Sequence, residues 1–129
     1  MQKGVPQIMD ITSIKSLLHA LSKNILPSRF ENAQQPESNT IQLCFRGVDF
    51  QTWLEVSWHG DSPRILKINQ PEKIGRESTL SKQIRYGLKY MALISIEQDN
   101  FERVIKFGFA KKPGDEIIKY LIFELMGKH

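Results

Sequence analysis

The sequence contains one cysteine, Cys44, and this scarcity excludes an internal disulfide bond. It also lacks the apolar amino-terminal segment of a secretory signal, because "MQKGVPQIMD" is polar. No run of about 18 apolar residues is present to span a membrane. We therefore expect a protein of a reducing compartment, the cytoplasm, without a membrane partner.

Signatures of catalysis and metal binding are also missing. The three histidines, His19, His59 and His129, are far apart, and no C-x2-C or H-E-x-x-H spacing occurs. No G-x-S-x-G, P-loop or G-x-G-x-x-G motif is found. We predict no catalytic residue, no metal and no cofactor, with His19 in a structural role near an apolar helix face and Cys44 packed as a small hydrophobic side chain.

The bulk composition is that of one globular domain. The chain has 129 residues, of which 40% are hydrophobic and 25% charged, and this length suffices to bury a core. The formal net charge of +4 and the pI of about 9.3 are compatible with an anionic partner.

Apolar spacing predicts two amphipathic helices. In residues 10–26 the apolar side chains recur at intervals of three and four, with Asp10 as N-cap and Pro27 as stop. The second segment, 77–91, begins with Ser78 or Thr79 as a cap. The apolar positions are Ile11, Ile14, Leu17, Leu18, Leu21 and Ile25 in the first helix, and Leu80, Ile84, Leu88 and Met91 in the second.

Alternating patterns predict strands within 40–47, 49–60 and 64–71, and again at 92–98, 102–110 and 116–126. The last is apolar on both faces, which predicts a place in the middle of a sheet. Together the elements predict an α+β fold: an antiparallel β-sandwich-like meander of six or seven strands with two amphipathic helices. The segment 28–39 is expected to end in turn residues.

Three patterns suggest candidate binding sites. Lys82, Arg85 and Lys89 recur on the polar side of the second helix, where they form either a phosphate-contacting stripe or a solvated face. Trp53 points away from the side that carries Leu54, and is either a stacking platform for a base or covered by a helix.

The stretch "ISIEQDNFERVIKF", residues 94–107, predicts a hairpin turning at Asp99-Asn100. A two-residue loop would place Glu97 opposite Glu102, whereas a three-residue loop would place it opposite Arg103. Arg103 continues an apolar face and needs an anionic partner. That partner is either a structural carboxylate, from Glu97 or Asp10, or an anion such as a phosphate.

Three stretches resemble the amino-terminal domain of the NFACT proteins, formerly known as fibronectin-binding protein A homologues. They are "MDITSIKSLLHAL", "RFENAQQPESNTIQLCFR" and "FERVIKFGF" followed by "LIFELMGKH". The second is similar to the family's strand, Gln-Pro turn and strand. Family members are much longer and continue past the stretch that ends here at His129. We therefore expect residues 1–129 to be a single, truncated domain of a longer multidomain protein.

The resemblance implies a role in ribosome-associated quality control. Members of the NFACT family bind the large ribosomal subunit that carries peptidyl-tRNA, recruit tRNA and support the C-terminal alanine tailing of stalled chains. It also implies a fold similar to the amino-terminal domain of formamidopyrimidine-DNA glycosylases. Those enzymes need an amino-terminal proline-glutamate pair, whereas Gln2-Lys3 follow the methionine here, so DNA chemistry is not expected.

The family's tRNA-handling residues match Asp10, Glu102 and Arg103, with glutamate in place of the family's aspartate at Glu102. We predict that the three side chains converge on one exposed edge. Two alternative functions remain: a surface adhesin for fibronectin or fibrinogen, disfavoured by the absent signal and the basic charge, and a glycosylase-like nucleic-acid-binding domain without catalysis.

Overall fold

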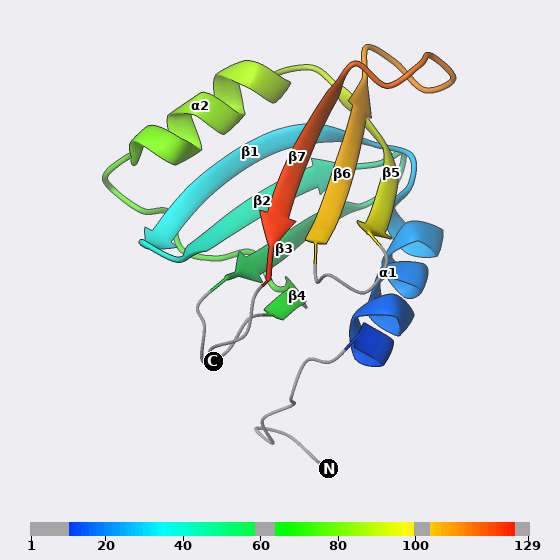
Figure 1. Ribbon diagram of the computed structural model, residues 1–129. Coiled ribbons are helices and arrows are strands. Elements are labelled where there is room, and N and C mark those ends of the chain that lie inside the picture. The colour runs from blue at the N-terminus through cyan, green and yellow to red at the C-terminus, as the bar shows by residue number, and fades with distance from the viewer. Residues whose placement is uncertain (1–10, 59–63, 100–103, 126–129) are drawn as a thin grey trace.

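The computed structural model describes residues 11–58, 64–99 and 104–125, which form two helices and one antiparallel sheet of seven strands (Figure 1). This arrangement confirms the predicted α+β class. The sheet order is β4-β3-β2-β1-β5-β6-β7. The elements are α1 (Ile11–Ile25), β1 (Ser28–Glu37), β2 (Thr40–Arg46), β3 (Gln51–Ser57), β4 (Arg64–Ile68), α2 (Thr79–Leu88), β5 (Ala92–Asp99), β6 (Val104–Ala110) and β7 (Lys119–Glu124).

The sheet bends sharply where β1 meets β5. The two strands pair only at Ser28–Leu93 and Arg29–Ala92, and the Phe30 amide donates to the Met91 carbonyl at 2.9 Å. Beyond this short contact the strands diverge, and Figure 1 shows β5, β6 and β7 crossing in front of β1, β2 and β3. One continuous sheet thus folds over itself, and the result resembles the predicted sandwich.

The core fills the space between the two halves of the sheet. Phe45 on β2 stacks on Phe107 and Phe109 of β6, with ring centroids 6.3 and 6.4 Å apart, and all three are fully buried. Trp58 stacks on Phe123 of β7 at 6.0 Å. Because strands two or more places apart in the sheet meet through these rings, the aromatic cluster holds the bend closed. Burial of one such ring contributes about 1.5–3 kcal/mol.

Both predicted helices form where their apolar spacing indicated. On α1, Leu18, Leu21 and Ile25 are buried, and the helix packs beside β5. His19 is exposed, so its assignment to the apolar face is wrong: the apolar stripe is narrower than the spacing alone implied.

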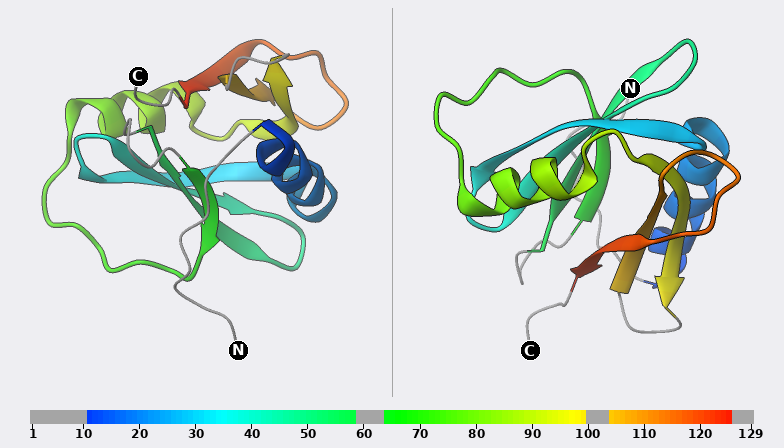
Figure 2. Two further views of the ribbon diagram at one scale, coloured as in Figure 1. Left: turned by 60° about the horizontal axis from the view of Figure 1, so that its bottom comes forward. Right: turned by 90° about the horizontal axis from the view of Figure 1, so that it is seen from above.

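The helix α2 starts at a well-formed cap. The Ser78 hydroxyl accepts from the Ser81 amide at 3.0 Å, and the Ser81 hydroxyl accepts from the Ser78 amide at 3.2 Å. Ile84 and Leu88 are buried against β1, which leaves the opposite side of α2 in solvent (Figure 2). The predicted cap and apolar stripe are therefore confirmed.

The position of β7 corrects one prediction. Among the described strands β7 lies at the edge of the sheet, next to β6 alone, and not in its middle. Phe123 is buried on the inner face, whereas Tyr120 and Ile122 on the outer face are 51% and 54% exposed. Two apolar faces indicated a doubly covered strand, but only the inner face is covered by the described residues.

The hairpin of β5 and β6 has neither of the two expected registers. Glu97 pairs with Lys106, and Asp99 pairs with Val104. The residues between them, 100–103, lie outside the described part of the chain. The turn is longer than the Asp-Asn pattern suggested, and a lysine takes the place opposite Glu97. Ile105, Phe107 and Phe109, which alternate along β6, form the apolar face of this strand, since all three are fully buried.

The strand β1 was not expected from residue patterns: Ser28–Glu37 form a ten-residue strand that runs through Pro36. The expectation that residues 28–39 end in turn residues is confirmed, because the turn falls at Ser38-Asn39. The pairing shifts between Gln34 and Glu37, which accommodates the proline without a ladder bond. The turn that the resemblance implied at Gln35-Pro36 therefore lies three residues further along, at Ser38-Asn39.

Candidate nucleic-acid interface

Two adjoining hollows lie where α2, β1 and the loop after β6 meet. One, of about 610 Å³, opens between α2 and β1. The other, of about 420 Å³, lies between β1 and the loop at 111–113. Arg29 and Tyr90 line both, so the hollows form one surface, here named the basic groove. Its basic and aromatic side chains are Arg29, Arg46, Arg85, Lys89, Lys111, Lys112, Tyr86 and Tyr90.

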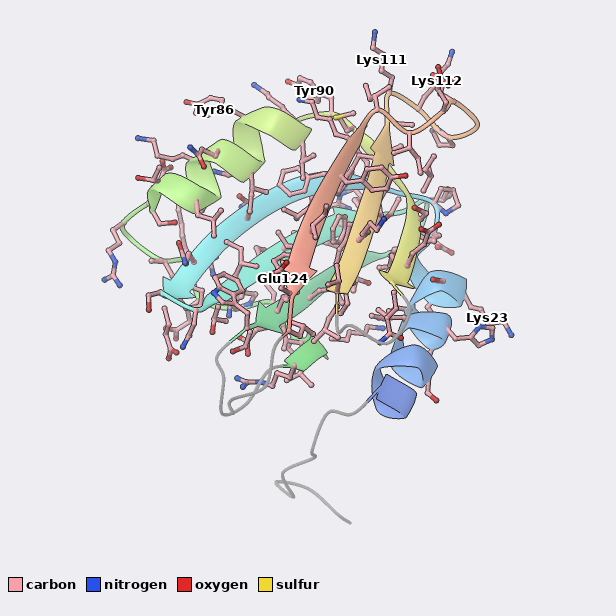
Figure 3. All side chains as sticks on the ribbon, in the orientation of Figure 1. Lys23, Tyr86, Tyr90, Lys111, Lys112 and Glu124 are labelled. Carbon is pink, nitrogen blue, oxygen red and sulfur yellow. The ribbon has the colours of Figure 1, made fainter. Side chains whose placement is uncertain are left out.

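Three segments far apart in the sequence bring these side chains together. Tyr86 lies in the last turn of α2, and Tyr90 directly follows the C-cap residue Lys89. Lys111 and Lys112 extend from the loop between β6 and β7. Figure 3 shows these four side chains along the same edge of the molecule. The short β1–β5 pairing places Arg29 between the two groups.

Two arginines of the basic groove are already neutralised by carboxylates. Glu31 accepts from Arg46 Nε at 2.7 Å and from Gln51 Nε2 at 2.6 Å. These hydrogen bonds, first that from Arg46, hold the pKa of Glu31 below its ordinary value. Arg85 forms an ion pair with Glu77, and its hydrogen bond lowers the pKa of that carboxyl.

The other cations are available to an anion. Arg29, Lys111 and Lys112 form no ion pair with another described residue. The Lys89 ammonium lies 5.1 Å from the centroid of the Tyr90 ring, a cation–π distance. The basic groove therefore carries an excess of about four positive charges beside two exposed aromatic rings. Lysine and arginine bind phosphates and aromatic rings stack on bases, so this surface has the chemistry of a nucleic-acid interface.

The predicted phosphate-contacting stripe divides in the structure. Lys89 and Arg85 line the basic groove, whereas Lys82 is exposed on α2 outside it. Arg85 forms an ion pair with Glu77, which lies just before the helix and outside the stripe. The groove residues that sequence reasoning missed are Arg29, Arg46, Tyr86, Tyr90, Lys111 and Lys112. Of these, the tyrosine spacing within "RYGLKY" was a usable signal.

The predicted tRNA-contacting residues Asp10, Glu102 and Arg103 lie outside the described residues. Their convergence stays a prediction.

Trp53, the suggested stacking platform, is only 8% exposed, so it is not available to a base. It neighbours Cys44 across the β2–β3 ladder. On the same face, Gln34 donates to the Glu72 carbonyl at 3.0 Å and accepts from the Ile74 amide at 3.2 Å, which ties the segment after β4 to β1.

Cys44 has the properties of a structural residue. Burial, followed by its hydrogen bond to Glu31, raises the pKa of the thiol to about 12. A thiol of this kind is not ionised at neutral pH and is a poor nucleophile.

Within residues 11–58, 64–99 and 104–125, no three side chains of the metal-binding kinds gather in one place. Neither described helix is long and apolar enough to cross a membrane.

The fold and the basic groove define a small α+β domain with a cationic, tyrosine-bearing surface. Residues 10–129 match the family of NFACT N-terminal and middle domains, and the chain belongs to this family. No curated protein matches the chain.

Three solved structures share the fold. The N-terminal domain of fibronectin-binding protein PavA from Streptococcus pneumoniae is 25% identical, with a TM-score of 0.80 over 93% of this chain and 46% of that one. The fibrinogen-binding protein from Staphylococcus aureus is 24% identical, with a TM-score of 0.74 over 93% and 43%. The N-terminal part of the fibronectin/fibrinogen-binding protein of Streptococcus suis is 23% identical, with a TM-score of 0.81 over 95% and 47%. The chain thus spans less than half of each of these structures.

Proposed function

We propose that this chain is a tRNA- and large-ribosomal-subunit-binding module of a ribosome-associated quality-control factor, which supports alanine tailing of stalled chains in the cytoplasm. The basic groove carries the proposal, because four cations without a carboxylate partner among the described residues stand beside two exposed tyrosines. Membership of the NFACT family supports it. The module acts by binding alone, with no cofactor, and contributes no catalytic residue.

Asp10, Glu102 and Arg103 complete the proposed tRNA contacts. The register supports a role for Arg103 beyond the hairpin, because Glu97, one of its suggested structural partners, lies opposite Lys106. We expect Arg103→Ala to weaken tRNA binding with little loss of fold stability. If the Arg103→Ala variant binds tRNA as tightly as the unaltered chain does, Arg103 is not part of the tRNA interface.

The test of the proposed function is a titration of labelled tRNA, paired with co-sedimentation on purified large ribosomal subunits. Because the avidity of further modules normally supplies much of the affinity, residues 1–129 should bind tRNA weakly at physiological salt. The affinity should fall steeply as salt rises, because phosphate contacts release counterions. Nanomolar binding would contradict the expected weakness, and no binding to either RNA at low salt would contradict the function itself.

The solved relatives are named as fibronectin-binding, fibrinogen-binding or fibronectin/fibrinogen-binding proteins. The same preparation should therefore be passed over immobilised fibronectin and fibrinogen. Salt-resistant binding to either protein, without binding to tRNA or ribosomal subunits, would favour the adhesin alternative.

A further inference from the structure

Tyr86 and Tyr90 are 76% and 74% exposed, although both are large aromatic residues. They line the hollow between α2 and β1. An exposed aromatic ring offers a face on which an unpaired base can stack.

Tyr90 also has an unusual backbone. It follows the C-cap residue Lys89 with a φ of 65°, in the left-handed region that glycine favours after a helix. The Met91 amide still closes the turn by donating to the Leu88 carbonyl at 3.0 Å. A glycine would satisfy this turn better than tyrosine does, so the helix end itself does not require the ring.

The charges around the two rings distinguish a place for phosphates from a place for bases. Lys89 lies beside the Tyr90 ring, and Arg29, Lys111 and Lys112 continue along the neighbouring hollow. The carboxylates Glu31 and Glu77 stand in the hollow of the tyrosines and would repel phosphates. Arg85 Nε, in that same hollow, is buried without a hydrogen-bond partner among the described residues.

From this arrangement we propose that the basic groove binds single-stranded RNA, with two unpaired bases stacked on Tyr86 and Tyr90 and their phosphates along Arg29, Lys89, Lys111 and Lys112. A duplex keeps its bases stacked inside, and only unstacked bases can reach exposed aromatic rings. This inference rests on the proposed function and narrows it to an unpaired segment of the RNA.

The test compares two probes by fluorescence anisotropy at one low salt concentration. One is a labelled single-stranded RNA of about ten nucleotides and mixed sequence, within the usual site size. The other is the same strand annealed to its complement. The single strand should bind at least about tenfold more tightly than the duplex. Equal binding of the two, or tighter binding of the duplex, would overturn the inference.

Two variants test the rings separately. Tyr90→Gly removes a ring and relieves the left-handed backbone, so its Tm should equal or exceed that of the unaltered chain. Tyr86→Ala replaces an exposed helical residue by a better helix former. Each should weaken single-strand binding by about 5- to 100-fold, the range for loss of one stacked base. Tyr86→Phe and Tyr90→Phe should retain binding, because the ring is retained.

Tyr120→Ala is the matched control, since this tyrosine is 51% exposed on β7, away from the basic groove. It should leave the affinity unchanged. If Tyr90→Gly and Tyr86→Ala bind the single strand as well as the control does, the stacking site is wrong. Should tRNA and ribosomal subunits still bind in a salt-dependent manner in that case, the proposed function would stand without it.

Discussion

The two sides of α2 differ in nearly every property. On one side the basic groove carries Arg29, Lys89 and two exposed tyrosines. On the other side, Leu80 and Ile84 face Leu121 of β7 across a hollow of about 400 Å³ that is mostly apolar. Lys119 lies near this second side, and its ammonium donates to the Gly87 carbonyl at 2.8 Å. The distribution of charge therefore says more about where a partner binds than the net charge of +4 does. The helix α2 separates the basic groove on one side from the apolar hollow beside β7 on the other.

The comparison predicts that packing changes alter stability and groove changes alter binding. Phe107→Ala should have the largest effect, because this fully buried ring contacts Phe45 from the other half of the sheet and Phe123 from the neighbouring strand β7. We expect a loss of about 3–5 kcal/mol in the free energy of unfolding, measured by urea denaturation. A loss below about 1 kcal/mol would show that the aromatic cluster does not hold the bend.

The opposite outcome is expected from the combined variant Lys89→Ala, Lys111→Ala and Lys112→Ala. Its tRNA affinity should fall by at least about tenfold at low salt. The slope of log K against log salt should shrink by about 2, at roughly 0.7 for each single-strand phosphate contact. Its stability should stay within about 0.5 kcal/mol.

A matched control removes three exposed lysines outside the basic groove, through Lys23→Ala, Lys67→Ala and Lys73→Ala. This control has the same net charge as the groove variant. An equal loss of tRNA affinity in both would mean that overall charge, and not the groove, attracts the RNA.

Ser78→Ala tests whether the cap of α2 supports both sides of the helix. The substitution removes the hydroxyl that accepts from the Ser81 amide, and should cost about 1 kcal/mol of unfolding free energy. RNA affinity measured well below the Tm should be nearly unchanged. Thermal unfolding and the tRNA titration together check both parts, and a large loss of affinity in the folded variant would show that the helix end reorganises.

The smallest expected effect concerns Glu31, whose pKa is lowered in the folded state. Such a carboxylate contributes stability above its unfolded pKa, and this contribution is lost as pH falls through the folded pKa. Glu31→Gln should therefore be less stable by roughly 1 kcal/mol at pH 7, by loss of a charge-assisted hydrogen bond. The difference should shrink as pH falls below the ordinary range of a glutamate pKa. A difference that does not change with pH would assign the effect to packing.

Local patterns predicted the helices well, because apolar spacing and the Ser78 cap act within one segment. They failed for the strand order. The edge position of β7 and the pairing of Glu97 with Lys106 depend on partners that local alternation does not specify. Alternation of apolar and polar residues did not predict the strand β1, because its residues alternate poorly and Pro36 lies near its end.

The candidate site was only partly predictable for the same reason. Lys89 belonged to a stripe visible in one helix, whereas Arg29 and Lys111 reach the basic groove from segments that the fold brings together. The Glu77–Arg85 ion pair joins residues eight positions apart across the start of α2. Such a pair becomes evident only once the helix start is known.

The most direct test of the central claim is ultraviolet cross-linking of 4-thiouridine-containing tRNA to the chain, with the linked residues mapped by mass spectrometry. The account predicts cross-links on the peptides that carry Tyr86, Tyr90 and Lys111-Lys112, and these should fade in the combined lysine variant. Cross-links confined to α1 or to β7, with none on α2 or on the loop after β6, would contradict it.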